Sequence, residues 1–439
     1  MREEIRALVL DAIADEFGAV YAPEFSVAPT ENPVHGDYAT NAALLVAKSA
    51  GMKPMDAAER IRQKIGAHEV IEKIEIAAPG FINFFLSGRA LTRALAKILA
   101  HPDAWGRSDV GKGKTVVVEY FQLNIAKRPH IGHIRSAIIG DALKRILLSQ
   151  GYNAVSDTHV GDWGTQFGIL LLGYREAGAD LHKREIAKDP FVELEEIYLA
   201  ENERIKNDPA RRDLAKQEFA KLEKGEWYRS IWRWMVMVSV KKLEQSAKRL
   251  GLLKFDKHLG ESFYVIGRPE NERSRIQEVL DIALAKEGVV KKTEDGAVIV
   301  DLTDEKLDEA ILIKSDGAST YLLRDLAAMR YRKDEWCFWK NLYVVDVRQS
   351  HHFKQLFRVA EMLGFEGVGE SRHIEFGFMK LPEGPMSTRA GNIVSLESVL
   401  NEAQDRARKI IAEKNPDLRN ADDVARMVGL GALKYFDLS

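Results

Sequence analysis

The stretch from Thr115 to Asp141 constrains the fold more than any other part of this 439-residue chain. It opens with the β-branched run "TVVVEYF", which follows a Gly-rich segment and is typical of a buried strand. A short loop then leads to "HIGHIRSAIIGD", whose apolar spacing predicts a helix. Strands that run into helices build parallel α/β sheets, which bind ligands at the carboxyl edge of their strands. We therefore expect a binding site at this junction.

Interruptions of the strand-helix rhythm divide the chain into segments. The first 107 residues mix helical patterns with short apolar runs such as "FINFFL", which indicates a small α+β domain. The later rhythm stops in charge-rich helices and a hairpin turned by Asp295-Gly296, and then resumes. We predict an α/β fold in which an insertion splits a parallel-sheet domain, with helices at the C-terminus after Ser395, a plausible N-cap. The expected segments are 1–107, 108–175 (first half of the sheet domain), 176–310 (insertion), 311–384 (second half) and 385–439.

Composition excludes several classes of protein. Lys and Arg total 64 against 66 Asp and Glu, so no global basic field indicates a nucleic-acid binder, and any polyanion would meet a local patch. The single cysteine, Cys337, excludes a disulfide framework and a cysteine-rich zinc site. No apolar run approaches the roughly 18 residues of a membrane span, and the N-terminus carries acids that a signal peptide avoids. These features predict a soluble, cytoplasmic protein.

Five features gather at the start of the predicted helix after the strand. His130 and His133 share one helical face, Gly132 between them lets a flat ring approach the backbone, and Lys127 and Arg128 add charge just upstream. A helix N-terminus has unpaired N–H groups and a partial positive charge, so it attracts phosphate. Helix capping with surface decoration is the alternative explanation. It accounts for the histidines alone but not for all five features together.

Seven segments carry a resemblance to a known family. "HIGH" at 130–133 resembles the motif of class I aminoacyl-tRNA synthetases, and "NIAKRPHIGHIRSAIIGD" is similar to the arginyl-tRNA synthetase form. The other segments follow in the order of that family. They are "HVGDWGTQFG" (159–168), "TYLLRDLAA" (320–328), "QSHHFKQLF" (349–357) and "MSTRAGN" (386–392), with "GDYATNAALLVAK" and "PGFINFFLS" near the N-terminus. The resemblance therefore spans essentially the whole chain.

The resemblance implies a Rossmann-type catalytic domain and a two-step reaction. The carboxylate of L-arginine attacks the α-phosphorus of ATP, which gives arginyl-adenylate and pyrophosphate, and the arginyl group is then transferred to the terminal ribose of tRNA(Arg) for translation. ATP with Mg²⁺ as its counter-ion would be the cofactor, and the protein would act as a monomer without a membrane partner. Placement and charge stabilisation would supply most of the catalysis, because the attacking carboxylate is already ionised. The N-terminal domain would contact tRNA.

The resemblance also implies roles for individual side chains toward ATP. Charged and hydrogen-bonding groups from the two motifs would surround the phosphates, and Gly132 would lie under the adenine. The expected catalytic residues are Lys127, His130, His133 and Arg389. The expected ATP-binding residues are Lys127, His130, Gly132, His133, His352, Met386, Ser387, Thr388 and Arg389, with His352 near the adenosine and the adjacent His351 facing elsewhere.

A second set of residues would line an arginine pocket. Glu119 interrupts an apolar strand, and a carboxylate buried there is costly unless a positive group lies against it. Tyr321 and Asp325 are four apart on one helical face, so both can point into one cavity. A salt bridge with Arg324 is the alternative for Asp325. By resemblance the arginine-binding residues are Glu119, Asn124, His130, Tyr321, Asp325 and Gln349.

Some positions depart from the family pattern. Pro385 and Ala390 stand where lysines are common beside Arg389, and Asp346 stands where a glycine is usual. Family members also continue into a helical anticodon-binding domain, most of which is expected to be absent here. These departures motivate an alternative function, a non-catalytic or truncated synthetase-like tRNA-binding or regulatory protein. For "HVGDWGTQFG" we expect either a turn-rich loop or a core plug formed by Trp163 and Phe167, with no chemistry assigned.

Overall fold

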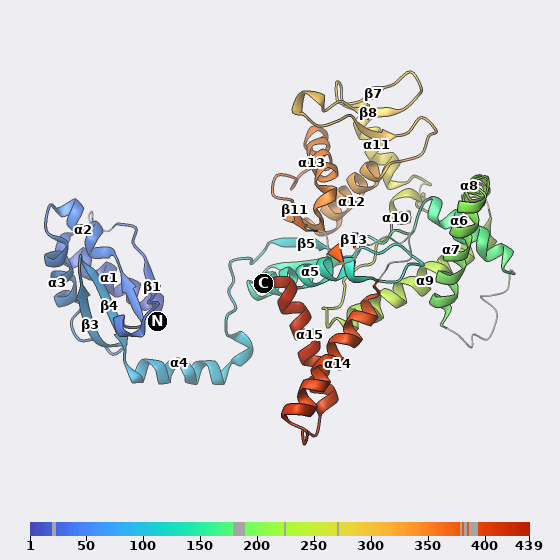
Figure 1. The fold of residues 1–439 in the computed structure, drawn as a ribbon. Helices are drawn as coiled ribbons and strands as arrows, with labels where there is room; N and C mark the ends of the chain where they lie inside the picture. The colour runs from blue at the N-terminus through green and yellow to red at the C-terminus, as the bar shows by residue number, and fades with distance from the viewer. Residues whose placement is uncertain are drawn as a thin grey trace. The chain divides into compact units, whose positions relative to one another are not determined.

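A computed structural model describes most of the chain in two compact units, Met1–Arg107 and Ser108–Ser439 (Figure 1). The described residues are 1–19, 23–178, 189–223, 225–269, 272–377, 380–381, 384–385 and 394–439. Within these ranges, no helix combines the length and the apolar character needed to cross a membrane.

The first unit is an α+β domain built on an antiparallel sheet. Its strands lie in the order β1-β2-β4-β3, and its core includes Ile5, Ile13, Ile61 and Phe84, all fully buried. The elements are α1 (Arg2–Phe17), β1 (Val27–Pro29), η2 (Pro33–His35), β2 (Tyr38–Thr40), α2 (Ala42–Ala50), α3 (Pro54–Ile65), β3 (Ile71–Ala77), β4 (Phe81–Leu86), α4 (Gly88–Ala100) and η3 (Pro102–Ala104).

The second unit is organised around a parallel sheet in the order β11-β10-β5-β6, which confirms the predicted fold class. The strands are β5 (Thr115–Glu119), β6 (Asn153–Asp157), β10 (Lys340–Asp346) and β11 (Arg372–Phe376). Three helices accompany them, α5 (Ile131–Ser149), α12 (Tyr321–Trp336) and α13 (Ser350–Leu363), with η7 (Val347–Gln349) before α13. The predicted strand and the predicted helix of the opening motif are β5 and α5.

The chain between β6 and β10 contains a helical group and a small sheet. The helices are α6 (Thr165–Glu176), α7 (Pro190–Asn207), α8 (Arg211–Ala220), η5 (Lys221–Glu223), α9 (Glu226–Arg249), α10 (Ser262–Val265) and α11 (Arg275–Ala285). The sheet is antiparallel, with η6 (Thr303–Glu305) before its last strand, and contains β7 (Lys291–Lys292), β8 (Val298–Val300) and β9 (Ala310–Ile313). The β7-β8 pair is the predicted hairpin, and Gly296 in its turn has φ 89°.

Two further helices follow β12 (Lys380–Leu381) and β13 (Gly384–Pro385), which pair antiparallel. They are α14 (Leu396–Lys414) and α15 (Ala421–Leu438), and they pack against each other (Figure 1). Ser395 caps α14 as predicted, because its side chain accepts a hydrogen bond from the Ser398 N–H.

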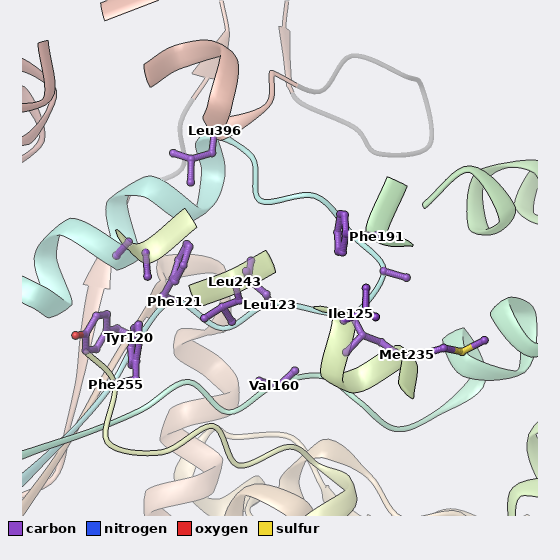
Figure 2. Packing of buried hydrophobic residues seen from close by; sticks show 14 of the residues in the cluster. Tyr120, Phe121, Leu123, Ile125, Val160, Phe191, Met235, Leu243, Phe255 and Leu396 are labelled. Atoms are coloured by element: carbon purple, nitrogen blue, oxygen red, sulfur yellow. The ribbon is translucent and has the colours of Figure 1, made fainter. Parts of the chain in front are cut away.

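Strand β5 is buried on both faces, as its unbroken apolar run predicts. Val116 and Val118 belong to one hydrophobic cluster, whereas Val117 belongs to a second cluster on the other side. Figure 2 shows how the first cluster continues beyond the strand, where Tyr120, Phe121 and Phe255 lie together. The loop between β5 and α5 therefore starts from a rigid base.

Close packing between α5 and the end of β5 depends on one glycine. A Cβ atom on Gly140 would lie 2.2 Å from Cγ of Tyr120, closer than real Cβ atoms approach other heavy atoms. By contrast, a Cβ atom on Gly431 in α15 would meet no atom within 4 Å. Close packing therefore requires glycine at position 140, whereas no steric contact requires glycine at position 431. The two positions can be compared as a test site and its control.

We expect Gly140→Ala to destabilise the second unit by about 2 kcal/mol or more through overpacking. Gly431→Ala should be neutral or stabilising by up to about 1 kcal/mol, because alanine favours helix. Urea unfolding followed by tryptophan fluorescence measures both, since Trp163, Trp232 and Trp339 lie in this unit. Equal stability of the two variants would contradict the packing assigned to Gly140.

Candidate active site

Residues in sparsely populated backbone conformations gather at the carboxyl edge of the sheet. Phe121 and Ala126 in the β5-α5 loop have φ of 59° and 51°, and His159 after β6 has φ of 40°. Hydrogen bonds hold the first two, because the Phe121 N–H donates to Ser136 Oγ (3.0 Å) and the Ala126 N–H donates to Ser239 Oγ (3.1 Å). Strain of this kind concentrates where a fold presents functional groups.

The two histidines of the opening motif cap α5, and their rings lie close together at an interplanar angle of 43°. The Gly132 N–H donates to Nδ1 of His130 (3.1 Å), and the His130 N–H donates to Nδ1 of His133 (3.2 Å). Their ring centroids are 3.9 Å apart. The alternative explanation by helix capping is therefore correct for the Nδ1 atoms of both histidines, which accept backbone hydrogen bonds. Since Nδ1 of each ring accepts, a neutral ring carries its proton on Nε2, where it can serve as a donor to a ligand.

Desolvation keeps both rings neutral. It lowers the pKa of His133 to about 3, with a smaller contribution from the charge of His130. Desolvation, followed by the charge of Lys127, also lowers the pKa of His130. The start of α5 therefore offers two neutral N–H donors together with the helix dipole, an arrangement suited to an anion.

The two cations upstream of the histidines have different surroundings. Nζ of Lys127 lies 5.4 Å from the ring centroid of Tyr198, whereas Arg128 forms an ion pair with Glu195 at 2.5 Å. Lys127 is therefore the better placed of the two to contact a ligand, because its charge is not already matched by that carboxylate.

Glu119 does not need a ligand to justify its burial. The side chain of Arg332 on α12 is fully buried, with Nη1 2.5 Å from Oε2 of Glu119 and Nη2 donating to Oδ2 of Asp157 at 2.8 Å. Burial alone would lower the pKa of Arg332, but the charges of Glu119 and Asp157 raise it well above its usual value. The positive group expected against Glu119 is therefore a guanidinium of the chain itself, and the place of Glu119 in an arginine pocket stays a prediction.

Asp325, by contrast, is held by two histidines. His352 Nε2 lies 2.6 Å from Oδ2 and His159 Nε2 lies 3.3 Å from Oδ1 of this carboxylate. Burial alone would raise the pKa of Asp325, but the hydrogen bonds from His159 and His352 hold it well below its usual range. The alternative prediction, a salt bridge between Asp325 and Arg324, is wrong, because Arg324 instead pairs with Glu261 at 2.7 Å.

His159 responds to the same carboxylate in the opposite direction. Burial alone would lower its pKa, but the hydrogen bond to Asp325 and the charge of Glu119 raise the pKa to about 9. Its Nδ1 is buried without a hydrogen-bond partner among the described residues. The arrangement creates a carboxylate at the sheet edge that is ionised at neutral pH and 21% exposed.

The remaining predicted arginine-binding residues lie at the surface. Tyr321 is 61% exposed, with the guanidinium of Arg324 4.6 Å from its ring centroid, and Gln349 and Asn124 are exposed. Asn124 lies against Gly161, where a Cβ atom would be 2.1 Å from its Oδ1. The structure thus brings Glu119, Asp325 and His352 to one edge but does not bury the other three.

Several predicted positions have other outcomes. Met386, Ser387, Thr388, Arg389 and Ala390 lie outside the described residues. Asp346 accepts hydrogen bonds from the backbone N–H and Nε of Arg348, so this departure from the family pattern is already matched by a cation. His351 pairs with Asp308 at 3.4 Å, apart from the Asp325 cluster. Trp163 contacts Phe219 and Trp232 edge-on, which agrees with the core-plug alternative.

Sequence reasoning missed His159 and Arg332. His159 opens the "HVGDWGTQFG" segment, to which no chemistry was assigned, and it lies two residues after the end of β6. Its place in that segment, near the carboxyl edge of the sheet, was the available signal. Arg332 lies two helical turns after Asp325 on the same face of α12, but nothing in its local sequence distinguishes it from a surface arginine.

Comparisons with known proteins identify the family. The model for "tRNA synthetases class I (R), catalytic domain" matches residues 94–439, and the model for "Arginyl tRNA synthetase N terminal domain" matches residues 3–86. The chain belongs to the arginyl-tRNA synthetase family. This confirms the predicted class of enzyme, a class I arginine–tRNA ligase.

Individual relatives agree with this family assignment. The arginine–tRNA ligase of Fusobacterium nucleatum is 38% identical over 421 residues, covering 95% of this chain and 70% of that protein. That of Halothermothrix orenii is 36% identical over 442 residues, covering 99% and 75%. The arginyl-tRNA synthetase structure from Plasmodium falciparum shares the fold, with TM-score 0.70, 24% identity and coverage of 100% and 74%.

The raised pKa of His159 predicts a pH dependence of stability in this arginyl-tRNA synthetase family member. The folded-state pKa of His159 is about 9, above the unfolded value of about 6.5, so protonation of His159 stabilises the fold. This stabilisation is fully present below about pH 6.5 and is lost as the pH rises through about 9. Between about pH 7 and about pH 9.5, the free energy of unfolding should fall by about 2 kcal/mol more in the wild type than in His159→Asn.

Asparagine tolerates the positive φ of this position and does not titrate, so the variant isolates the imidazole. Urea unfolding at the two pH values provides the measurement. An equal pH dependence in both proteins would exclude His159 as the titrating group.

Proposed function

We propose that this chain activates L-arginine with ATP to form arginyl-adenylate and transfers the arginyl group to tRNA(Arg). One observation carries the proposal beyond family membership. A helix N-terminus with two neutral imidazole donors follows β5. An ionised, partly exposed carboxylate, Asp325, is held at the same sheet edge by His159, which follows β6, and by His352 of α13, which follows β10. The first arrangement suits a polyphosphate and the second suits a cationic side chain, and the reaction needs both.

The phosphate end of the site would be formed by α5. Nε2 of His130 and His133, the dipole of α5 and Nζ of Lys127 can together stabilise negative charge that moves from the α-phosphorus toward pyrophosphate. Neutral imidazoles donate hydrogen bonds without requiring a proton to be taken up. Arg389, with Met386, Ser387 and Thr388, remains proposed for the second phosphate-binding motif on the family resemblance.

The arginine end would be centred on Asp325. A guanidinium presents planar N–H donors that match a carboxylate, and such a pair is strongest where water is partly excluded. His352 and His159 now donate to this carboxylate, so bound arginine would share it with them or replace them. Glu119 would contribute to the arginine end through its partners. It pairs with Arg332, and its Oε1 accepts a hydrogen bond from Nε2 of Gln122 at 2.8 Å. Asn124, Tyr321 and Gln349 would close the pocket from exposed positions.

The chemistry then needs no protein nucleophile. An oxygen of the arginine carboxylate forms a bond to the α-phosphorus, and the bond to the bridging oxygen breaks with its electron pair leaving on pyrophosphate. In the second step a ribose hydroxyl of tRNA attacks the acyl carbon, and AMP leaves. Fixing the reactants in line and stabilising charge are sufficient tasks for the residues described.

We propose Mg²⁺ as the counter-ion that accompanies ATP. In the part of the chain that the structure describes, no three His, Cys, Asp or Glu side chains are arranged to hold a metal ion. We therefore assign it no protein ligands and no step. We also propose that the protein acts in the cytoplasm as a monomer and that tRNA contacts both units.

Arginine-dependent exchange of pyrophosphate into ATP, measured with and without tRNA(Arg), tests the proposed function directly. Exchange that requires arginine supports it, and transfer to tRNA(Arg) completes it. Binding of tRNA(Arg) without exchange under either condition would overturn it in favour of a non-catalytic, tRNA-binding role.

In the same assay we expect Asp325→Asn to raise the KM for arginine by about 100-fold, because a charge-assisted pair to the guanidinium is lost. The KM for ATP should change by less than about threefold. Asp308→Asn is the matched control, since Asp308 also pairs with a histidine of α13 but is 92% exposed. An unchanged KM for arginine in Asp325→Asn would remove Asp325 from the pocket.

A further inference from the structure

Arg135 on α5 contacts two segments that are far from it in the sequence. Its Nε lies 3.0 Å from Oδ1 of Asp437 in the last turn of α15, and its Nη1 donates to the Gly377 carbonyl at 2.8 Å. Gly377 directly follows β11 and precedes the "MSTRAGN" motif in the chain. One guanidinium thus joins the helix that carries His130 and His133, the end of a sheet strand and the C-terminal helix.

The ion pair is more enclosed than most pairs on the surface of this protein. The side chain of Asp437 is 2% exposed and that of Arg135 is 24% exposed. Oδ2 of Asp437 is buried without a hydrogen-bond partner among the described residues, so Arg135 is its principal source of compensation. Removing one partner would leave the other desolvated and unpaired, which costs more than loss of an exposed pair.

The next residue in the same helical turn, Ser136, is fixed to the sheet. Ser136 Oγ donates to the Val344 carbonyl in β10 at 2.8 Å and accepts from the Phe121 N–H. The first two turns of α5 are therefore held by the sheet and by Gly377 and α15. His133 lies two residues before Arg135, so a movement at Arg135 would shift the imidazole donors.

We propose that Arg135 is a positioning residue, through which Asp437 of α15 and the end of β11 set the orientation of the His130-His133 donors. The inference rests on the proposed function for its effect on ATP. Arg135 need not touch the substrate, because it acts on the helix that does. Among the described residues it joins the C-terminal helical pair to the candidate phosphate site by direct side-chain contact.

The test compares Arg135→Met, Asp437→Asn and the double variant in arginine-dependent pyrophosphate exchange. We expect each single variant to raise the KM for ATP about tenfold, because misplaced donors bind phosphate less well. The KM for arginine should stay within about twofold, and the double variant should be no worse than Arg135→Met, since both changes break one contact. Arg135→Lys, which keeps the charge but not the fork, should be intermediate.

Arg145→Lys is the matched control on the same helix. Arg145 pairs with Asp141 at 2.8 Å and donates to the Gly251 carbonyl rather than to Gly377, and it lies further along α5. Its KM for ATP should stay near the wild-type value. Unchanged KM for ATP in Asp437→Asn and Arg135→Met, or an equal loss in Arg145→Lys, would overturn the proposal.

Amide hydrogen exchange separates this inference from the proposed function. Asp437→Asn should speed amide hydrogen exchange in residues 372–377 and in the first turns of α5. The amide rates of the N-terminal unit should not change. If the wild type lacks arginine-dependent exchange of pyrophosphate, the proposed function fails, but these amide rates still test the contact. Amide rates that match the wild type in both regions would overturn the positioning role.

Discussion

The architecture of the second unit depends on one buried guanidinium. Arg332 joins Glu119 at the end of β5 to Asp157 at the end of β6, and it does so from α12. A charge so deeply buried is tolerated only when it is paired, and removing one partner of such a group typically costs about 3 to 5 kcal/mol. The interaction therefore fixes α12 against the sheet edge. Asp325 on the same face of α12 is brought to that edge as a consequence.

Burial and neighbouring charge divide the histidines of this edge into two kinds. Desolvation and a second imidazole lower the pKa of His133 to about 3, whereas the Asp325 carboxylate raises the pKa of His159 to about 9. The neutral pair at α5 can donate hydrogen bonds to an anion. The histidines at Asp325 instead keep a carboxylate ionised. The same residue type thus prepares one end of the edge for negative charge and the other for positive charge.

The sequence predicts local features well and tertiary partners poorly. The β5 strand, the α5 helix, the β7-β8 hairpin and the Ser395 cap follow from periodicity and turn chemistry, and all were confirmed. The cost of burying Glu119 was also correctly recognised, but its partner was not. Arg332 and Glu119 are brought together by the parallel sheet and by α12, and no local pattern encodes a pairing between segments so far apart. The family resemblance named Asp325 as a candidate arginine-binding residue. Its contact with His159 could not be predicted, because the two residues lie in segments far apart in the sequence.

The chain between β6 and β10 takes part in the site rather than decorating it. Ser239 of α9 accepts from the strained Ala126 N–H, and Trp232 of the same helix donates from Nε1 to the Asp162 carbonyl at 3.0 Å. Asp162 in turn accepts from Ser262. Because strained backbone persists only where surrounding contacts hold it, the β5-α5 loop requires α9. An interruption of the sheet domain is compatible with catalysis when the inserted helices return to support the loop that the sheet edge presents.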